Sequence, residues 1–117
     1  MTRRLLADSS TYYRKDATRG DTVILWCNST VLSAVQWTQN TTDRYSDVYV
    51  NGTIVGPSYA TDRFSVVSFS SGDYNLKIYN VHSVDSGLYD CYESSGRRIV
   101  GYYLVTKGML IIIMKAK

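Results

Sequence analysis

Short segments in which apolar and polar residues alternate run through most of the chain. Val23, Leu25 and Cys27 share one side of an extended segment, and Leu76 and Ile78 share one side of another. No stretch sustains the three- and four-residue apolar spacing of an amphipathic helix. The alternation therefore predicts an all-β fold whose strands each turn one side toward a common core.

Turn-forming residues separate these segments at short intervals. Residues 48–55 contain Asn51-Gly52 between two apolar halves, a pair that favours a tight hairpin turn. Residues 70–73, Ser-Ser-Gly-Asp, mark a second turn between two apolar segments. Many short strands joined by such turns are typical of a β-sandwich.

Composition favours one globular domain. The chain has 117 residues, enough for one two-layer core, and 44% of them are hydrophobic. Its net charge of +3 comes from scattered basic residues, without the basic stripe of a nucleic-acid-binding domain. The apolar run 109–114 is far shorter than the ~20 residues that cross a bilayer, so a membrane anchor would lie outside this sequence. Residues 5–7 are too short for a signal-peptide core, which favours a mature or excised extracellular domain.

No pattern typical of catalysis or of a metal site is visible. His82 is the only histidine, and the carboxylates of Asp43, Asp47, Asp62 and Asp73 fall in different expected loops. A glycine-rich phosphate loop is also absent from the sequence. We therefore expect no enzymatic activity, no cofactor and no metal site.

One ordered set of residues carries a resemblance to a known family. Trp37 follows Cys27 by ten positions, Cys91 follows Cys27 by 64, and Tyr89 precedes Cys91 by two within the stretch D-S-G-L-Y-D-C. In this set the chain resembles variable-type (V-set) immunoglobulin-superfamily domains. Two unpaired, buried thiols in a cytosolic protein are the alternative interpretation of the cysteines.

The resemblance implies a Greek-key sandwich of about nine strands, in sheets A/A′BED and GFCC′C″. It places strands A/A′ in residues 1–19, strands B to F in 20–93, the F–G loop in 94–105, and strand G with the chain end in 106–117. It also implies a Cys27–Cys91 disulfide, core positions Trp37, Leu76 and Tyr89, and an Arg63–Asp85 salt bridge. Such a salt bridge is often partly exposed and then contributes at most about 1 kcal/mol.

Residues 107–115 can be aligned with the joining segment G-x-G-T-x-L-x-V of antigen-receptor variable domains. Gly108 matches the second glycine, Ile111 the leucine and Ile113 the valine, whereas Thr106 and Met109 depart from the pattern. The alignment makes this apolar tail strand G. A cloning remnant is the rival interpretation of the tail.

Strand alternation then predicts two overlapping surfaces on the front GFCC′ sheet. The apolar side chains that point outward from strand G would be covered by a second copy or by a docked partner. Cover by the N-terminal strand or by a neighbouring domain is the alternative. The F–G loop is rich in tyrosine and arginine, the residues of binding hot spots. A plain F–G hairpin whose tyrosines pack on its own strands is the alternative. The candidate dimer face comprises Gln36, Thr38, Tyr49, Leu110, Ile112 and Met114, and the candidate ligand-binding residues are Tyr92, Arg97, Arg98, Tyr102 and Tyr103.

Asn28, Asn40 and Asn51 each begin an N-x-S/T glycosylation sequon, although the asparagines could equally serve turns. We expect an extracellular recognition module, the ligand-binding domain of an immune-type cell-surface or secreted receptor. Its partner would be a protein ligand or a second copy; two arginines make an acidic glycan a weaker candidate, and no nucleic acid is expected. A homophilic adhesion module, or a structural domain of a larger ectodomain, are the alternatives.

Overall fold

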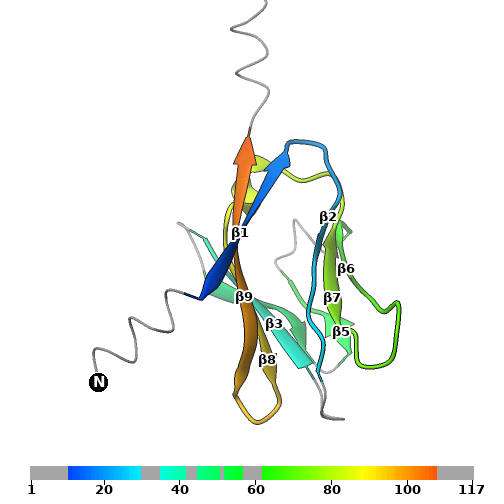
Figure 1. Cartoon of the computed structure of the whole chain (residues 1–117). Coiled ribbons are helices and arrows are strands. Elements are labelled where there is room, and N and C mark those ends of the chain that lie inside the picture. Colours follow the sequence, from blue (N-terminus) through cyan, green and yellow to red (C-terminus); the bar gives the residue numbers. More distant parts are fainter. Residues whose placement is uncertain (1–10, 30–34, 42–44, 51, 57–61, 108–117) are drawn as a thin grey trace, which may run out of the picture.

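The computed structural model describes residues 11–29, 35–41, 45–50, 52–56 and 62–107, and these residues form two facing β-sheets (Figure 1). Turns and one short 3-10 segment, η2 (Ser83–Asp85), join the strands. The strands are β1 (Tyr12–Thr18), β2 (Val23–Leu25), β3 (Val35–Asn40), β4 (Tyr45–Val50), β5 (Thr53–Ile54), β6 (Phe64–Val67), β7 (Asn75–Ile78), β8 (Gly87–Glu93) and β9 (Arg98–Lys107).

The larger sheet has the order β1-β9-β8-β3-β4-β5, and the smaller has the order β2-β7-β6. Only the β1–β9 pairing among these described strands is parallel. The predicted all-β, two-sheet sandwich is confirmed, and so is its disulfide between Cys27 and Cys91. None of the helical segments in the described ranges is long and apolar enough to cross a membrane.

The N-terminal strand differs from expectation in one respect. The sequence grouped residues 1–19 with the smaller sheet, but β1 pairs with β9 in the larger one, from Tyr12 opposite Gly101 to Thr18 opposite Lys107. Figure 1 shows β1 and β9 side by side at the edge of the sandwich. Ala17 is the buried residue of this strand, so β1 is held mainly by backbone pairing and by contacts on its outer side.

The predicted end of the F–G loop (94–105) and the predicted start of strand G (106–117) are wrong. Strand β9 covers Arg98–Lys107 and pairs with β8, so the connecting turn is only residues 94–97. Gly96 adopts a positive φ of 96° there, and the Glu93 amide donates to the Arg97 carbonyl at 2.9 Å. The turn sequence S-S-G thus closes a tight hairpin. The expected joining-type segment from Gly108 onward lies outside the described residues.

The core lies between the sheets around the disulfide. Trp37, Leu76 and Tyr89 are fully buried, and Trp37 lies opposite Cys91 in the β3–β8 pairing. The Trp37 indole N–H donates to the Tyr74 carbonyl at 2.8 Å. The Tyr89 hydroxyl donates to the Asp85 carbonyl at 2.6 Å, so even the polar atoms of the large core rings have partners.

The Arg63 and Asp85 side chains meet near the end of the sandwich at which η2 lies. Two guanidinium nitrogens of Arg63 lie 2.8 and 3.0 Å from the two Asp85 carboxylate oxygens. The Arg63 and Asp85 side chains are only 11% and 0% exposed, so the pair is buried. Such pairs are often partly exposed, and this was the expectation from the sequence. The His82 amide also donates to Asp85 at 2.8 Å, which ties the turn before β8 to the same carboxylate.

Candidate functional site

The outer side of the larger sheet, which we call the front face, is defined by strand register. Trp37 and Cys91 point inward, so their neighbours Gln36, Tyr92, Thr38 and Asp90 point outward. The front face comprises Tyr12 on β1, Gln36 and Thr38 on β3, Tyr45 and Asp47 on β4, Asp90 and Tyr92 on β8, and Arg98 and Tyr103 on β9.

A charged cluster lies at the centre of the front face. Arg98 Nε donates to one Asp90 carboxylate oxygen at 2.7 Å, and the Tyr12 hydroxyl donates to the other at 3.0 Å. The Arg98 guanidinium also lies 4.3 Å from the centroid of the Tyr12 ring, a cation–π distance. The cluster therefore joins three neighbouring strands, β1, β9 and β8, through their side chains.

Gly101 makes room for this cluster. It lies between Tyr12 on β1 and Asp90 on β8, as their partner in both pairings. A Cβ atom there would lie 2.7 Å from an Asp90 oxygen, 2.7 Å from the Tyr12 ring, and in collision with the Arg98 guanidinium. The Arg98 side chain thus occupies the space above β9 that any other residue at position 101 would fill.

Burial and charge shift the pKa values of the tyrosines here. Burial, together with the hydrogen bond and the negative charge of Asp90, raises the pKa of Tyr12 to about 12, although Arg98 opposes the shift. Burial first, and then the charge of Asp90 and the neighbouring Tyr45, raise the pKa of Tyr92. Both rings are therefore neutral hydrogen-bonding groups at physiological pH.

Exposed tyrosines share the front face with the charged cluster. Tyr45 is 64% exposed on β4, and Tyr103 is 45% exposed on β9. Beside Tyr92, the Gln36 amide donates to Asp47 at 2.8 Å. By contrast, Thr38 and Asp90 point to the same side but are buried, so larger side chains on the face cover them.

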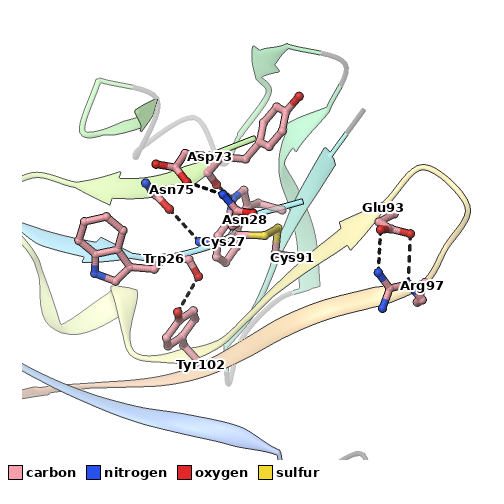
Figure 2. Close-up of a disulfide and its surroundings, with 11 residues drawn as sticks. Trp26, Cys27, Asn28, Asp73, Asn75, Cys91, Glu93, Arg97 and Tyr102 are labelled. Carbon is pink, nitrogen blue, oxygen red and sulfur yellow. Dashed lines mark hydrogen bonds and ion pairs between the residues drawn. A yellow bond between two sulfur atoms is a disulfide. The ribbon is translucent and has the colours of Figure 1, made fainter. Parts of the chain in front are cut away.

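Adjacent Tyr102 and Tyr103 point to opposite sides of β9. Tyr102 turns inward, with its ring 6.4 Å from that of Trp37, and its hydroxyl donates to the Trp26 carbonyl at 2.6 Å (Figure 2). It therefore links the two sheets and is not part of the front face. Tyr49, expected on the dimer face, also packs against the core. A register shift in the β3–β4 pairing places it opposite the inward Trp37.

Both predicted binding arginines form ion pairs within the domain. Arg98 is paired with Asp90, as described, and Arg97 Nη2 lies 2.8 Å from a Glu93 oxygen across the hairpin turn (Figure 2). The Arg97 hydrogen bond and charge hold the pKa of Glu93 below its usual value. Arg97 is exposed, whereas Arg98 is largely enclosed by its partners.

The two described glycosylation candidates lie on different sheets. Asn40 is exposed at the end of β3, and Asn28 is exposed just after β2 on the smaller sheet. The apolar row Leu110, Ile112 and Met114 and the third sequon residue, Asn51, lie outside the described residues. Within the described ranges, no three His, Cys, Asp or Glu residues are grouped to hold a metal ion.

The central role of Tyr12 and Gly101 was not recognised from the sequence. Both matter because β1 runs parallel to β9, a pairing between segments far apart in the chain that has no local sequence signal. The outward position of Asp90 did follow from alternation. A glycine within a strand-like segment is the signal that could have pointed to Gly101, because it often marks close approach by other groups.

Comparisons with known proteins agree with this geometry. Residues 11–103 match the family model of the immunoglobulin V-set domain. A search of curated proteins found no match. Among solved structures, the ZIG-8 IG1 homodimer is similar, with a TM-score of 0.69 and 15% identity over 84% of this chain and 81% of that chain.

Two further solved structures share the fold. The extracellular domain of the voltage-gated sodium channel beta4 subunit, described as a parallel homodimer in cell–cell adhesion, gives a TM-score of 0.65 and 14% identity, over 84% of this chain and 87% of that chain. The ZIG-8–RIG-5 IG1–IG1 heterodimer gives 0.65 and 13%, over 82% of each. At these identities the likeness is one of fold.

Proposed function

Because the chain belongs to the immunoglobulin V-set domain family, we propose that it is an extracellular recognition domain that binds a protein partner through the front face. One observation carries the proposal: exposed Tyr45 and Tyr103 share the front face with the enclosed Asp90–Arg98 pair. Tyrosine rings offer large contact areas at a low cost in side-chain entropy. The Asp90 and Arg98 charges can orient a partner on the face. Because they are already paired with each other, a partner that covers them leaves no buried ion unpaired.

The disulfide supports an extracellular setting. Bridges such as Cys27–Cys91 form and persist in oxidising compartments and are rare in the cytosol. The fold by itself would not identify a binding role, since many functions share this sandwich. We therefore rest the recognition role on the front face, and we propose a receptor ectodomain or a secreted receptor as its context.

The sheet is a better candidate contact surface than the β8–β9 turn. That turn has four residues, 94–97, and the Glu93–Arg97 pair bridges its base. This turn offers a small contact area, and its exposed charged side chain, Arg97, is already paired with Glu93. Tyr45, Tyr92 and Tyr103, in contrast, come from three strands of one rigid sheet. Arg97 then lies at the edge of the binding surface.

Alanine variants on opposite sheets test the proposal. Tyr45→Ala and Tyr103→Ala remove front-face rings, and Tyr79→Ala removes a 42% exposed ring that follows β7 of the smaller sheet. The domain would be screened against a panel of extracellular proteins, and binding of each hit would be measured by surface plasmon resonance. We expect a loss of about tenfold or more for at least one front-face variant, as at hot spots, and none for Tyr79→Ala. Equal binding by all three variants would reject the front face.

Self-association is the second candidate. The Asp90 and Arg98 charges are paired within each copy, so two front faces can meet without either of these charges needing a partner from the other copy. Similar folds are described as homodimers and heterodimers, which at this identity illustrates only that such sandwiches can pair. Sedimentation velocity across a dilution series decides between the two candidates: a dimer lost in Tyr103→Ala favours self-recognition, and a monomer at all concentrations favours a different partner.

A further inference from the structure

An exposed pair of aromatic rings lies on the smaller sheet, away from the front face. Trp26 is 53% exposed and Phe69 is 66% exposed, with ring centroids 5.5 Å apart. Trp26 directly follows β2, and Phe69 lies in the turn between β6 and β7. Two neighbouring rings that are open to water form an apolar surface that favours a cover.

Asn28 lies in the same outward row as Trp26. Burial alternates along this part of the chain, with Leu25 and Cys27 buried and Trp26 and Asn28 exposed. Cys27 and Asn28 continue the extended pairing, since the Tyr74 amide donates to the Cys27 carbonyl at 2.8 Å. Side chains two positions apart on such a chain point to the same side, with Cα atoms about 6.6 Å apart.

Asp73 ties Asn28 to the aromatic pair. The Asn28 amide nitrogen donates to one Asp73 carboxylate oxygen at 2.7 Å, as Figure 2 shows, and the Phe69 backbone amide donates to the other at 3.2 Å. One carboxylate therefore fixes both the direction of the Asn28 side chain and the backbone that carries Phe69. The first of these bonds also holds the pKa of Asp73 below its usual value.

We propose that Asn28 carries an N-linked glycan whose first N-acetylglucosamine packs against Trp26 and Phe69. Asn28-Ser29-Thr30 is a sequon. The inference rests on the extracellular location in the proposed function, because the acceptor must pass through a secretory compartment. Pyranose C–H faces pack well on aromatic rings, so the sugar would cover the apolar pair.

The glycosyl transfer uses a lipid-pyrophosphate-linked oligosaccharide as donor. The Asn28 amide nitrogen loses one proton and forms a bond to C1 of the first sugar, while the bond from C1 to the pyrophosphate oxygen breaks. The lipid pyrophosphate leaves with the bonding electrons. The substituted amide keeps one N–H, which is the hydrogen that the bond to Asp73 requires. The orientation seen in the unmodified chain can therefore persist after modification.

A glycan at Asn28 is compatible with binding through the front face. A glycan at Asn28 would cover the aromatic pair of the smaller sheet and leave the front-face tyrosines open. Asn40, in contrast, lies opposite the exposed Tyr45 in the β3–β4 pairing, so a glycan there would crowd the proposed binding surface. We therefore infer that Asn28 is the sequon whose occupancy stabilises the fold.

Site occupancy is the first test. The chain would be secreted from a eukaryotic cell line, and glycopeptides would be identified by mass spectrometry before and after enzymatic deglycosylation. We expect Asn28 to be glycosylated in most molecules of the secreted protein. A secreted, folded protein with an unmodified Asn28 would overturn the proposal.

The second test measures whether the sugar packs on the rings. The glycans would be trimmed to one N-acetylglucosamine, and the melting temperature Tm would be compared with that of Thr30→Ala, which keeps Asn28 but removes its sequon. We expect the loss of this sugar to lower Tm by about 2–5 °C, the shift that a modest packing loss causes in a domain of this size. In a Phe69→Ser background the same comparison should show a much smaller fall.

A matched control separates the sugar from the substitutions. Thr30→Ala in protein made without glycosylation gives the effect of residue 30 itself, which is subtracted. Equal Tm losses in the native and the Phe69→Ser backgrounds after this correction would reject the packing. Occupied Asn28 with no effect of the front-face tyrosine variants would instead reject the proposed function and leave the glycan site standing.

Discussion

The guanidinium group of Arg98 lies in the space directly above Gly101, where the Cβ atom of any other residue would be. There it contacts both the Asp90 carboxylate and the Tyr12 ring. The arrangement ties β1 to the rest of the larger sheet through side chains as well as through backbone pairing. The absence of a side chain at position 101 is thus what allows the central cluster of the front face to form.

We expect Gly101→Ala to lower the free energy of unfolding by about 1–3 kcal/mol, the usual cost of overpacking. The added methyl group would displace Arg98 from Asp90 and weaken the docking of β1. Urea denaturation would measure the change, and hydrogen exchange would locate it to residues 12–18. Gly56→Ala is the matched control, because its Cβ would make an ordinary contact of 3.7 Å with the Asp47 carbonyl. Similar losses for the two variants would contradict this account of Gly101.

The buried Arg63–Asp85 pair predicts a larger effect. Asp85→Asn would leave the Arg63 charge, which is only 11% exposed, beside a neutral amide. We expect a loss of about 3 kcal/mol in the free energy of unfolding, as for breaking a buried pair from one side. The exposed Arg14–Asp16 pair, 60% and 50% exposed, is the comparison, and Asp16→Asn should cost at most about 0.5 kcal/mol. Equal costs would mean that burial does not control the strength of these pairs.

Much of the fold could be predicted because the chain carries both a family resemblance and a local strand pattern. The spacing of Cys27, Trp37, Tyr89 and Cys91 resembles that of V-set domains, which implied four core side chains on three segments, and all four are buried. Strand alternation then separates inward from outward residues, and it correctly placed Asp90 and Tyr92 on the outside. The outward positions follow from the two-residue period of a strand, whereas the core positions and the disulfide were implied by the resemblance to V-set domains.

The last strand could not be placed with the same certainty, because two apolar segments compete for it. Residues 109–114 are the more apolar, so alignment favoured them, whereas β9 uses Arg98–Lys107. The short turn 94–97 brings β9 directly beside β8. The Glu93–Arg97 ion pair that closes this turn was not predicted, because the segment was expected to be a loop. The bulge that turns Tyr49 inward, and the parallel pairing of β1, likewise depend on neighbours distant in the chain.

The elevated pKa of Tyr12 predicts a loss of stability at high pH. The folded chain retains the Tyr12 proton up to about pH 12, whereas an unfolded chain loses it near pH 10. Between these values the unfolded state binds fewer protons, so the free energy of unfolding falls as pH rises. A phenolate absorbance titration would compare the native chain with Tyr12→Phe. The difference between them should appear near pH 12, and its appearance near pH 10 would contradict the burial and the Asp90 contact.

The disulfide predicts both a stability loss and a slow reaction. Cys27 is 2% exposed and Cys91 is fully buried, so a reducing thiolate cannot reach the sulfur atoms until the sandwich opens. Reductant alone should therefore act slowly, at a rate that rises steeply with added urea. Once the bond is broken, the 64-residue separation between the cysteines implies a loss of about 4 kcal/mol on the chain-entropy model. Thiol labelling would follow the reaction, and denaturation of the reduced chain would measure the loss. An unchanged midpoint after complete reduction would show that core packing alone holds the two sheets together.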